Sequence, residues 1–286
     1  DFCLSRGLGD VYKRQEYMRY DPVYRAHHQN SLTFSLIYAW SERFMLPFSH
    51  DEVVHMKGSM LNKMPGDHWQ QFANLRALYG FMYGHPGKKL LFMGSEFGQW
   101  AEWNFAGYLD WALVEGPNVV TTLHGQVRDL VRDLNALLRG YPALHARDFA
   151  PEGFEWIDGS DSAQSVISFA RYAPGHTDPL IFVCNFTPVP RYAYRLGMPV
   201  AAPAYEEVLN SDALTYGGSN IGNLGAVMCE AVPSHGWQQS VALSLPPLAT
   251  LVLRPTPAAV TGAKATGVKA KTATRLVRAR REGDTP

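Results

Sequence analysis

Residues 44–55, FMLPFSHDEVVH, decide the fold expected for the first half of the chain. Residues 44–48 are apolar throughout, which is typical of a strand buried on both faces of a parallel sheet. Residues 89–93, KLLFM, are apolar after Lys89 and predict a second buried strand. Polar residues follow each strand, SHDE after the first and, beyond one glycine, SEF after the second. This arrangement is typical of a β/α barrel, in which functional residues lie where the strands end.

A helix is predicted between these two strands. Asp67 is a suitable N-cap, and Gln70 completes a capping-box pattern with it. Apolar residues then recur at helical spacing up to the HPG stop at 85–87. Further helices are predicted from Asp21-Pro22, over Leu32–Glu42 and over Gly125–Arg139. A closed barrel needs eight strands and only two are visible, so this part is expected to be the last piece of a barrel.

Beyond Pro142 the pattern changes to short runs separated by proline and glycine, which is typical of antiparallel strands. The predicted strands are Phe154–Ile157, Ser165–Tyr172, Leu180–Phe186, Tyr192–Leu196, Glu206–Leu209 and Val241–Arg254. They predict an antiparallel β-sandwich of about a hundred residues, expected to fold more independently than the first half. The predicted fold class is therefore α/β plus all-β.

The composition excludes several classes of protein. The 286 residues are 46% hydrophobic and 18% charged, too apolar for a disordered chain and too poor in charge for a coiled coil. No apolar run approaches the roughly 18 residues of a membrane-spanning helix, so no membrane partner is predicted. The three cysteines include no CxxC pair, which favours a reducing, cytoplasmic compartment.

The two ends differ from the rest of the chain. Residues 256–286 are rich in Ala, Thr, Gly and basic residues, so this tail is predicted to be disordered. The tail is basic and the remaining chain is mildly acidic, which argues against nucleic acid as the partner of the folded part. Binding of nucleic acid by the tail itself is a minor hypothesis. Residues 1–15 have no initiator Met and no signal-peptide pattern, and we interpret them as a non-native scar joined to a longer protein.

The strongest candidate site is the His50-Asp51 pair after the first strand. Zinc is not favoured, because HExxH places its histidines four residues apart, whereas His50 and His55 are five apart. A carboxylate at the end of a barrel strand suits a sugar, since it accepts hydrogen bonds from hydroxyls and stabilises an oxocarbenium-like transition state. The alternative is structural, with Asp51 capping the next helix beside a core histidine.

The second candidate is SEFGQWAEWN at residues 95–104, with Glu96, Trp100 and Trp103 as predicted substrate-binding residues. Indole rings stack on the apolar face of a pyranose, while carboxylates and amides bind its hydroxyls. For each single Trp, the alternative of a packed core or loop anchor stays open.

Several segments carry a resemblance to a known family. In order they include LPFSHDEVVH, MPGDHWQQFANLRALYGFMYGHPGKKLLFMGSEFGQWAEWN, GFEWI, NFTPVPR, EVLNSD, YGGSNIGN and SLPPLATLVL. Over about Glu16 to Arg254 the chain resembles the C-terminal half of bacterial 1,4-α-glucan (glycogen) branching enzymes, members of the α-amylase superfamily. The basic tail has no counterpart in this resemblance.

The resemblance implies roles for the matching positions. In that superfamily a retaining mechanism uses an Asp nucleophile on the fourth barrel strand and a Glu acid/base on the fifth. A further Asp after the seventh strand grips the sugar. Asp51 matches this Asp and is implied to stabilise the transition state, and His50 matches the His that bonds the same glucosyl unit. The nucleophile and the acid/base precede everything present here, so this C-terminal fragment alone is expected to be inactive.

The resemblance also organises the chain and its expected function. The predicted parts are the scar at 1–15, the last strands and helices of a catalytic (β/α)₈ TIM barrel at 16–141, a C-terminal β-sandwich at 142–255 and the tail at 256–286. The implied activity is glycogen branching, the transfer of an α-1,4-glucan segment to a 6-hydroxyl to form α-1,6 branch points, in the cytoplasm. The expected partner is an α-glucan such as glycogen or an amylose-like chain, with no metal or other cofactor, and the protein is expected to be a monomer. Two alternatives stay open: another α-glucan-active enzyme of the superfamily, such as a hydrolase or a trehalose-forming transglycosylase, and a non-catalytic glucan-binding module.

Overall fold

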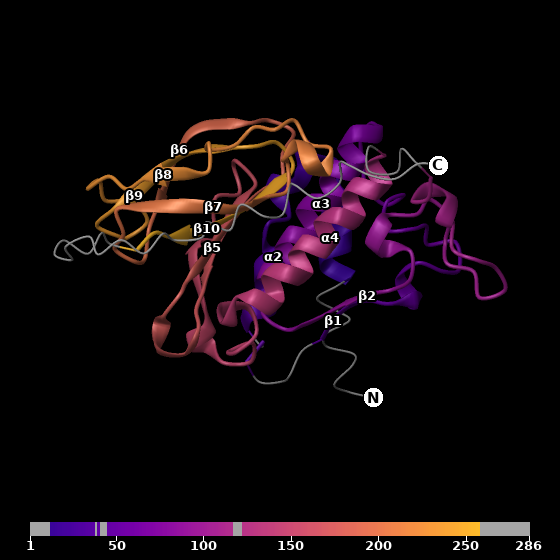
Figure 1. Ribbon diagram of the computed structural model, residues 1–286, viewed down its shortest axis with the longest axis horizontal. Helices are drawn as coiled ribbons and strands as arrows, with labels where there is room; N and C mark the ends of the chain where they lie inside the picture. The colour runs from indigo at the N-terminus through magenta and orange to yellow at the C-terminus, as the bar shows by residue number, and fades with distance from the viewer. Residues whose placement is uncertain (1–11, 38, 41–44, 117–121, 258–286) are drawn as a thin grey trace, which may run out of the picture.

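The computed structural model describes residues 12–37, 39–40, 45–116 and 122–257 (Figure 1). The predicted disordered tail lies outside these ranges except for residues 256 and 257. Most of the proposed scar also lies outside them, and its last residues belong to a helical segment over 12–19. The assignment of residues 1–15 as non-native stays a prediction.

Both strands that precede the candidate site residues are present. β1 (Met45–Phe48) and β2 (Lys88–Leu91) pair in parallel, and in Figure 1 they lie below the two long helices. β1 is buried from Leu46 onward, but the prediction of full burial is wrong for β2, whose residues are exposed or half-buried. Strand pairing does not explain this difference, because within the described ranges β1 and β2 each have only the other as a strand neighbour. Leu46 and Phe48 lie in the main core cluster, whereas Leu91 is only partly buried against it. This parallel pair is all that the described residues contain of the predicted barrel sheet.

The helix that connects these strands, α3 (His68–Gly84), begins with the predicted capping box. The Asp67 carboxylate accepts a hydrogen bond from the Gln70 amide N–H (2.9 Å). The Gln70 side-chain oxygen accepts one from the Asp67 amide N–H (3.0 Å). From Phe72 to its end the helix is buried on all sides, because it contacts α4 on one side and strands of a large sheet on the other.

The other helices differ from the predictions mainly at their ends. α4 (Leu123–Gly140) begins at Leu123 rather than Gly125, because the Thr122 hydroxyl accepts a hydrogen bond from the Gly125 amide N–H (3.0 Å). Asp21 caps a short 3-10 helix, η1 (Pro22–His27). The helix predicted over residues 32–42 starts earlier, as α2 (Asn30–Thr33) followed by η2 (Phe34–Ile37). Residues 38, 41 and 42 of that prediction lie outside the described ranges.

The described strands of the second half pair antiparallel, as predicted. They form a six-stranded sheet in the order β3-β4-β5-β10-β7-β8 and a two-stranded ribbon, β6-β9. Their bounds are β3 (Phe154–Asp158), β4 (Val166–Arg171), β5 (Leu180–Asn185), β6 (Arg191–Gly197), β7 (Ala204–Asn210), β8 (Ala226–Met228), β9 (Ser240–Leu245) and β10 (Ala249–Pro255). The prediction of one strand over Val241–Arg254 is wrong. Pro246 and Pro247 separate β9 from β10, because proline cannot donate a ladder hydrogen bond.

The six-stranded sheet is the middle of three layers. One of its faces packs in the same cluster as α3 and α4, through residues such as Phe169 and Phe182. Its other face packs on the β6-β9 ribbon, through residues such as Val183 and Leu251. Every residue of β4 and β5 is buried as a consequence. The β-sandwich is therefore confirmed, with the helices covering its second face.

The two halves share a core, which argues against the expectation that the sandwich folds more independently than the first half. Polar contacts also cross the predicted boundary at residue 142. The Thr250 hydroxyl on β10 donates to the Ala77 carbonyl of α3 (3.1 Å). Arg76 Nε donates to the carbonyl of Ser211, beyond the end of β7 (2.9 Å). Since these groups are buried, we expect the two halves to unfold together.

Within the described ranges, no helix is both long and apolar enough to span a bilayer.

Candidate functional site

His50 and Asp51 lie in a single 3-10 turn, η3 (His50–Glu52), that follows β1 directly. His50 Nε2 lies 3.1 Å from Asp51 Oδ1, and the two side chains are 55% and 59% exposed. The structural alternative is wrong at both positions. Asp51 lies inside the turn rather than at its N-cap, which is Ser49, and His50 is not a core residue. Both side chains are therefore open to a ligand at the carboxyl end of a parallel strand.

An aromatic wall stands beside this pair. Phe92 follows β2, and its amide N–H donates to the Phe48 carbonyl (2.9 Å), so the ends of the two strands meet here. The His50 ring lies 5.8 Å from the Phe92 ring and 6.5 Å from the Trp103 ring, between centroids. Trp103 is itself half-buried and contacts Phe92 edge to face, at 5.1 Å. The structure thus brings together three of the predicted site residues: His50, Asp51 and Trp103.

Glu102 holds the loop that follows η3. Its carboxylate accepts hydrogen bonds from the amide N–H groups of Met56 (3.1 Å) and Gly58 (2.5 Å). The loop needs an anchor because Met56 adopts a left-handed backbone conformation (φ 65°), which is unfavourable for a side chain of its kind. Sequence reasoning missed this role, since no local pattern relates Glu102 to a loop 44 residues earlier.

Two lysines fix the backbone of η3 from the other side. Lys57 Nζ donates to the Asp51 carbonyl (2.7 Å), and Lys63 Nζ donates to the Glu52 carbonyl. Burial lowers the pKa of Lys63 to about 8. The buried Glu52 carboxylate accepts a hydrogen bond from Gln15 Nε2 (2.7 Å), so the helical segment over 12–19 also supports the turn.

A cavity of about 520 Å³ adjoins η3. Charged residues of both signs line it, among them Glu16, Arg19, Glu52 and Lys57. Its volume lies within the range of about 300–1,000 Å³ common for small-molecule sites. The cavity lies on the side of η3 that carries Glu52, and neither His50 nor Asp51 lines it.

Comparison with known proteins shows what the chain is similar to. Over 254 residues the chain is 56% identical to the 1,4-alpha-glucan branching enzyme GlgB of Cupriavidus necator, a match that covers 88% of this chain and 33% of that protein. It is 56% identical over 256 residues to GlgB of Rubrobacter xylanophilus, covering 90% of this chain and 34% of the relative. Residues 156–256 match the family described as alpha amylase, C-terminal all-beta domain. Over about nine-tenths of its length the chain is therefore similar to one part of the 1,4-α-glucan branching enzymes. It spans about a third of the length of the curated relatives that it matches.

Solved structures agree on the fold. The chain aligns with an alpha-amylase from H. orenii at a TM-score of 0.50 and 13% identity, covering 88% of this chain and 48% of that one. It aligns with CldA, a cyclomaltodextrin glucanotransferase with three domains, at a TM-score of 0.52 and 12% identity, covering 90% and 44%. At these identities the likeness shows a shared amylase-type fold.

The other two predicted site residues, Trp100 and Glu96, have no described contact with the His50-Asp51 pair. The Trp100 ring stacks on His68 (5.5 Å between centroids, 26° between planes) and meets Phe72 and His124 edge to face. This is the packing alternative, in which the ring anchors its loop to the N-terminal ends of α3 and α4. A sugar-binding role for Trp100 stays a prediction.

Glu96 lies half-buried in η4 (Ser95–Phe97). Burial, with a smaller contribution from the Glu96 charge, raises the pKa of Tyr79 well above its usual value. The Tyr79 hydroxyl donates to the Ser95 carbonyl (2.7 Å), so the phenol stays protonated and fixes the turn. The binding role of Glu96 also stays a prediction.

The described residues include no cluster of three or more His, Cys, Asp or Glu side chains suited to a metal ion. The histidines of HDEVVH are both exposed, and the described contacts of the His50 ring are with Asp51, Phe92 and Trp103.

Proposed function

We propose that this chain is the C-terminal part of a cytoplasmic enzyme that transfers an α-1,4-glucan segment to a sugar 6-hydroxyl, forming the α-1,6 branch points of glycogen. The observation that carries the proposal is the identity of 53–56% to branching enzymes over about nine-tenths of the chain. The proposed substrate is an α-glucan, either glycogen or an amylose-like chain, and the proposed state is a monomer.

The proposed organisation follows the predicted boundaries. We assign residues 16–141 to the last strands and helices of a (β/α)₈ barrel and residues 142–255 to the sandwich domain. The parallel pair β1-β2 with its connecting helix α3 supports the first assignment, because βαβ units build such barrels. The family match over residues 156–256 supports the second.

In this proposal Asp51 stabilises the transition state without forming a bond to the sugar. Its exposed carboxylate accepts hydrogen bonds from ring hydroxyls, and its charge opposes the positive charge that develops on the sugar ring. His50, held 3.1 Å away, offers an imidazole nitrogen to another hydroxyl of the same unit. Trp103 lies at the edge of the His50 ring and provides an apolar surface for the sugar face.

Retaining transfer needs two carboxyl groups about 5 Å apart, one as nucleophile and one as acid/base. The resemblance assigns both to strands that precede the residues of this chain. We therefore propose that the 286-residue chain alone does not branch glucan and that the longer enzyme does.

Glucan staining tests the proposed function. Branching by the longer enzyme lowers the iodine absorbance of amylose without releasing reducing sugar, and α-1,6 linkages then appear in the product. A hydrolase of the same superfamily would release reducing ends instead, and a trehalose-forming enzyme would yield trehalose. Formation of α-1,6 linkages by the purified 286-residue chain would contradict the assignment of the missing roles.

A further inference from the structure

The Asp51 carboxylate depends on its backbone for its position. Within the described part of the chain, it has one polar partner, His50 Nε2 at 3.1 Å, and both side chains are more than half exposed. An aspartate side chain is short and occupies a few staggered rotamers, so the backbone of η3 largely sets the direction of the carboxylate. Whatever holds η3 therefore also decides where the Asp51 charge lies.

The 3-10 turn η3 ends with two carbonyl groups that its own backbone does not satisfy. The Glu52 amide N–H donates to the Ser49 carbonyl (3.2 Å). The Val53 amide N–H donates to the His50 carbonyl (3.0 Å). The carbonyls of Asp51 and Glu52 accept no backbone hydrogen bond from the described residues. Such terminal carbonyls need donors from outside the turn.

Two lysine side chains supply these donors, and they differ in exposure. Lys57 Nζ donates to the Asp51 carbonyl (2.7 Å), but Lys57 is exposed, so water competes for this contact. Lys63 Nζ donates to the Glu52 carbonyl, and Lys63 is only 8% exposed. Loss of a charged donor from a buried carbonyl costs more than loss of an exposed contact, because no water replaces it. Lys63 therefore makes the more important of the two contacts.

Lys63 is itself fixed by the core of the protein. Its amide N–H donates to the Ser59 carbonyl (3.3 Å). Its neighbours Met60, Leu61 and Met64 lie in the main core cluster. The Lys63 side chain thus connects the packed core to the end of η3.

We propose that Lys63 is a positioning residue for the transfer reaction: its buried ammonium group holds the end of η3 and so directs the Asp51 carboxylate at the sugar. This inference rests on the proposed function, in which Asp51 stabilises the transition state. Lys63 acts through the backbone of η3 and not by contact with the reacting atoms. A misplacement of about 1 Å can cost about a hundredfold in rate, so loss of this contact should reduce turnover in a folded enzyme.

Chemical rescue in the longer enzyme tests the proposal. Lys63→Met removes the ammonium group and keeps an unbranched side chain, whereas Lys63→Ala also leaves space for an added amine. Lys63 lines the cavity of about 520 Å³ beside η3, so a small amine can reach this space. Ethylammonium provides N–H donors, and tetramethylammonium carries the same charge without any N–H. Assays run at pH 7, where the Lys63 amine is protonated because its pKa is about 8.

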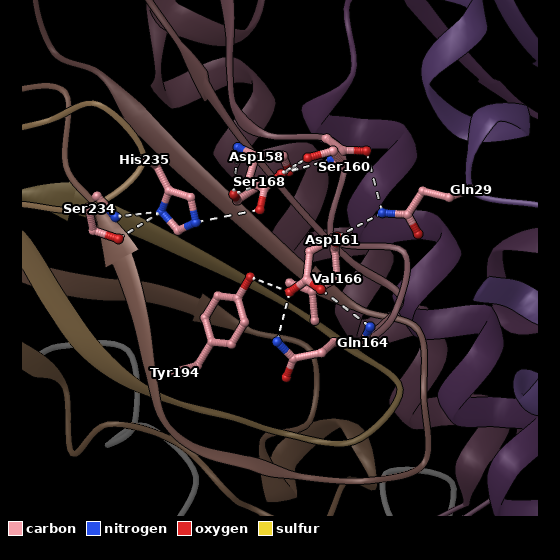
Figure 2. Close-up of polar contacts among 12 residues, drawn as sticks. Gln29, Asp158, Ser160, Asp161, Gln164, Val166, Ser168, Tyr194, Ser234 and His235 are labelled. Carbon is pink, nitrogen blue, oxygen red and sulfur yellow. Dashed lines mark hydrogen bonds and ion pairs between the residues drawn. The ribbon is translucent and has the colours of Figure 1, made fainter. Parts of the chain in front are cut away.

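The matched control is Gln29→Ala. Gln29 is 6% exposed, and its Nε2 donates to the Val166 carbonyl at the start of β4 (2.9 Å), as Figure 2 shows. This variant also removes a buried hydrogen bond from a side chain to a backbone carbonyl, but none of the described contacts of Gln29 is with η3. It should lower the melting temperature and leave kcat unchanged.

We expect both Lys63 variants to lower kcat about ten- to a hundredfold with little change in KM, because the substrate still binds but the Asp51 charge is misplaced. Ethylammonium should raise kcat of Lys63→Ala about tenfold, and tetramethylammonium at equal concentration should not. Neither ion should change kcat of the Gln29 variant. Unchanged kcat in Lys63→Met, or an equal response of Lys63→Ala to the two ions, would overturn the proposal.

Hydrogen exchange of the 286-residue chain tests the same contact without any activity. The Glu52 and Val53 amides should exchange about tenfold faster or more in Lys63→Met, because η3 loses the donor at its end, and the Gln29 variant should leave them unchanged. Equal protection of these amides in wild type and Lys63→Met would overturn the proposal. The proposed function has its own readout in α-1,6 linkage formation by the wild-type longer enzyme. Failure of that function is therefore distinguishable from failure of the role of Lys63.

Discussion

The contact between α3 and the large sheet makes a sharp prediction about Gly80. A Cβ atom built on Gly80 would lie 2.5 Å from Thr250 Cβ on β10, much closer than real carbon atoms approach. Thr250 cannot turn aside, because the obstructing atom is fixed by the strand backbone and its hydroxyl donates to the Ala77 carbonyl (3.1 Å). Gly80→Ala must therefore push the helix away from the sheet.

The expected cost follows from two opposing effects. Overpacking a core costs about 1–3 kcal/mol, and a clash with a backbone-fixed atom belongs in the upper half of that range. Replacing glycine by alanine inside a helix returns about 1 kcal/mol. The net loss in the free energy of unfolding is about 1–2 kcal/mol, or roughly 2–8 °C in melting temperature for a protein of this size.

Urea denaturation of the 286-residue chain measures this loss, with Gly140→Ala as the matched control. Gly140 ends α4, and a Cβ there would meet no atom within 4 Å, so this variant should be neutral or slightly stabilising. A double-mutant cycle with Thr250→Gly, which removes the obstructing atom, should show a coupling energy of about 1–3 kcal/mol. A Gly80→Ala protein as stable as the Gly140 control, or a cycle without coupling, would refute the close approach of α3 to β10.

Three further predictions concern the candidate site. In the longer enzyme, Asp51→Asn should cut kcat about a hundred- to a thousandfold with an unchanged melting temperature, because the exposed carboxylate supplies charge rather than packing; near-normal kcat would reject its catalytic role. Glu102→Ala should speed hydrogen exchange of the Met56 and Gly58 amides by about tenfold or more, because both lose their acceptor, and protection equal to the wild type would show that the loop does not need this anchor. Burial lowers the pKa of Lys63 in the folded protein from 10.5 to about 8. Between pH 8 and pH 10.5 the unfolded chain therefore binds more protons at this lysine than the folded protein does, and the free energy of unfolding rises with pH. Lys63→Met should reduce that slope in urea titrations at pH 8 to 10.5, and parallel wild-type and variant curves would contradict the buried amine.

Several features of the fold could be predicted because they depend on neighbouring residues. The capping box of α3 joins Asp67 to Gln70, three residues apart, and both of its hydrogen bonds form as expected. The strand that ends before His50 could be predicted from its own apolar run, and so could the position of the His50-Asp51 pair after it. Strand pairing was less predictable, and the burial expected for β2 was wrong because burial depends on which parts of the fold pack against the faces of a strand.

Two tryptophans with the same sequence context make different contacts in the tertiary structure. Trp100 and Trp103 lie three residues apart in one motif, and the sequence offers the same two interpretations for each. In the structure Trp103 lies beside His50, whereas Trp100 stacks on His68. Glu102 anchors a loop 44 residues earlier, and no spacing rule relates such distant positions.

The sequence by itself determined the caps, most of the strands and helices, and the resemblance to a known family, because these depend on hydrogen bonds and apolar spacing within a few residues or on matched motifs. Only the tertiary structure decided that both faces of the large sheet are covered, that α3 and β10 approach closely at Gly80, and which aromatic ring stands beside His50. The physical reason is that burial and side-chain contact are properties of surfaces that meet across the fold. Thr250 and Gly80 acquire their importance only when a strand and a helix 170 residues apart pack together.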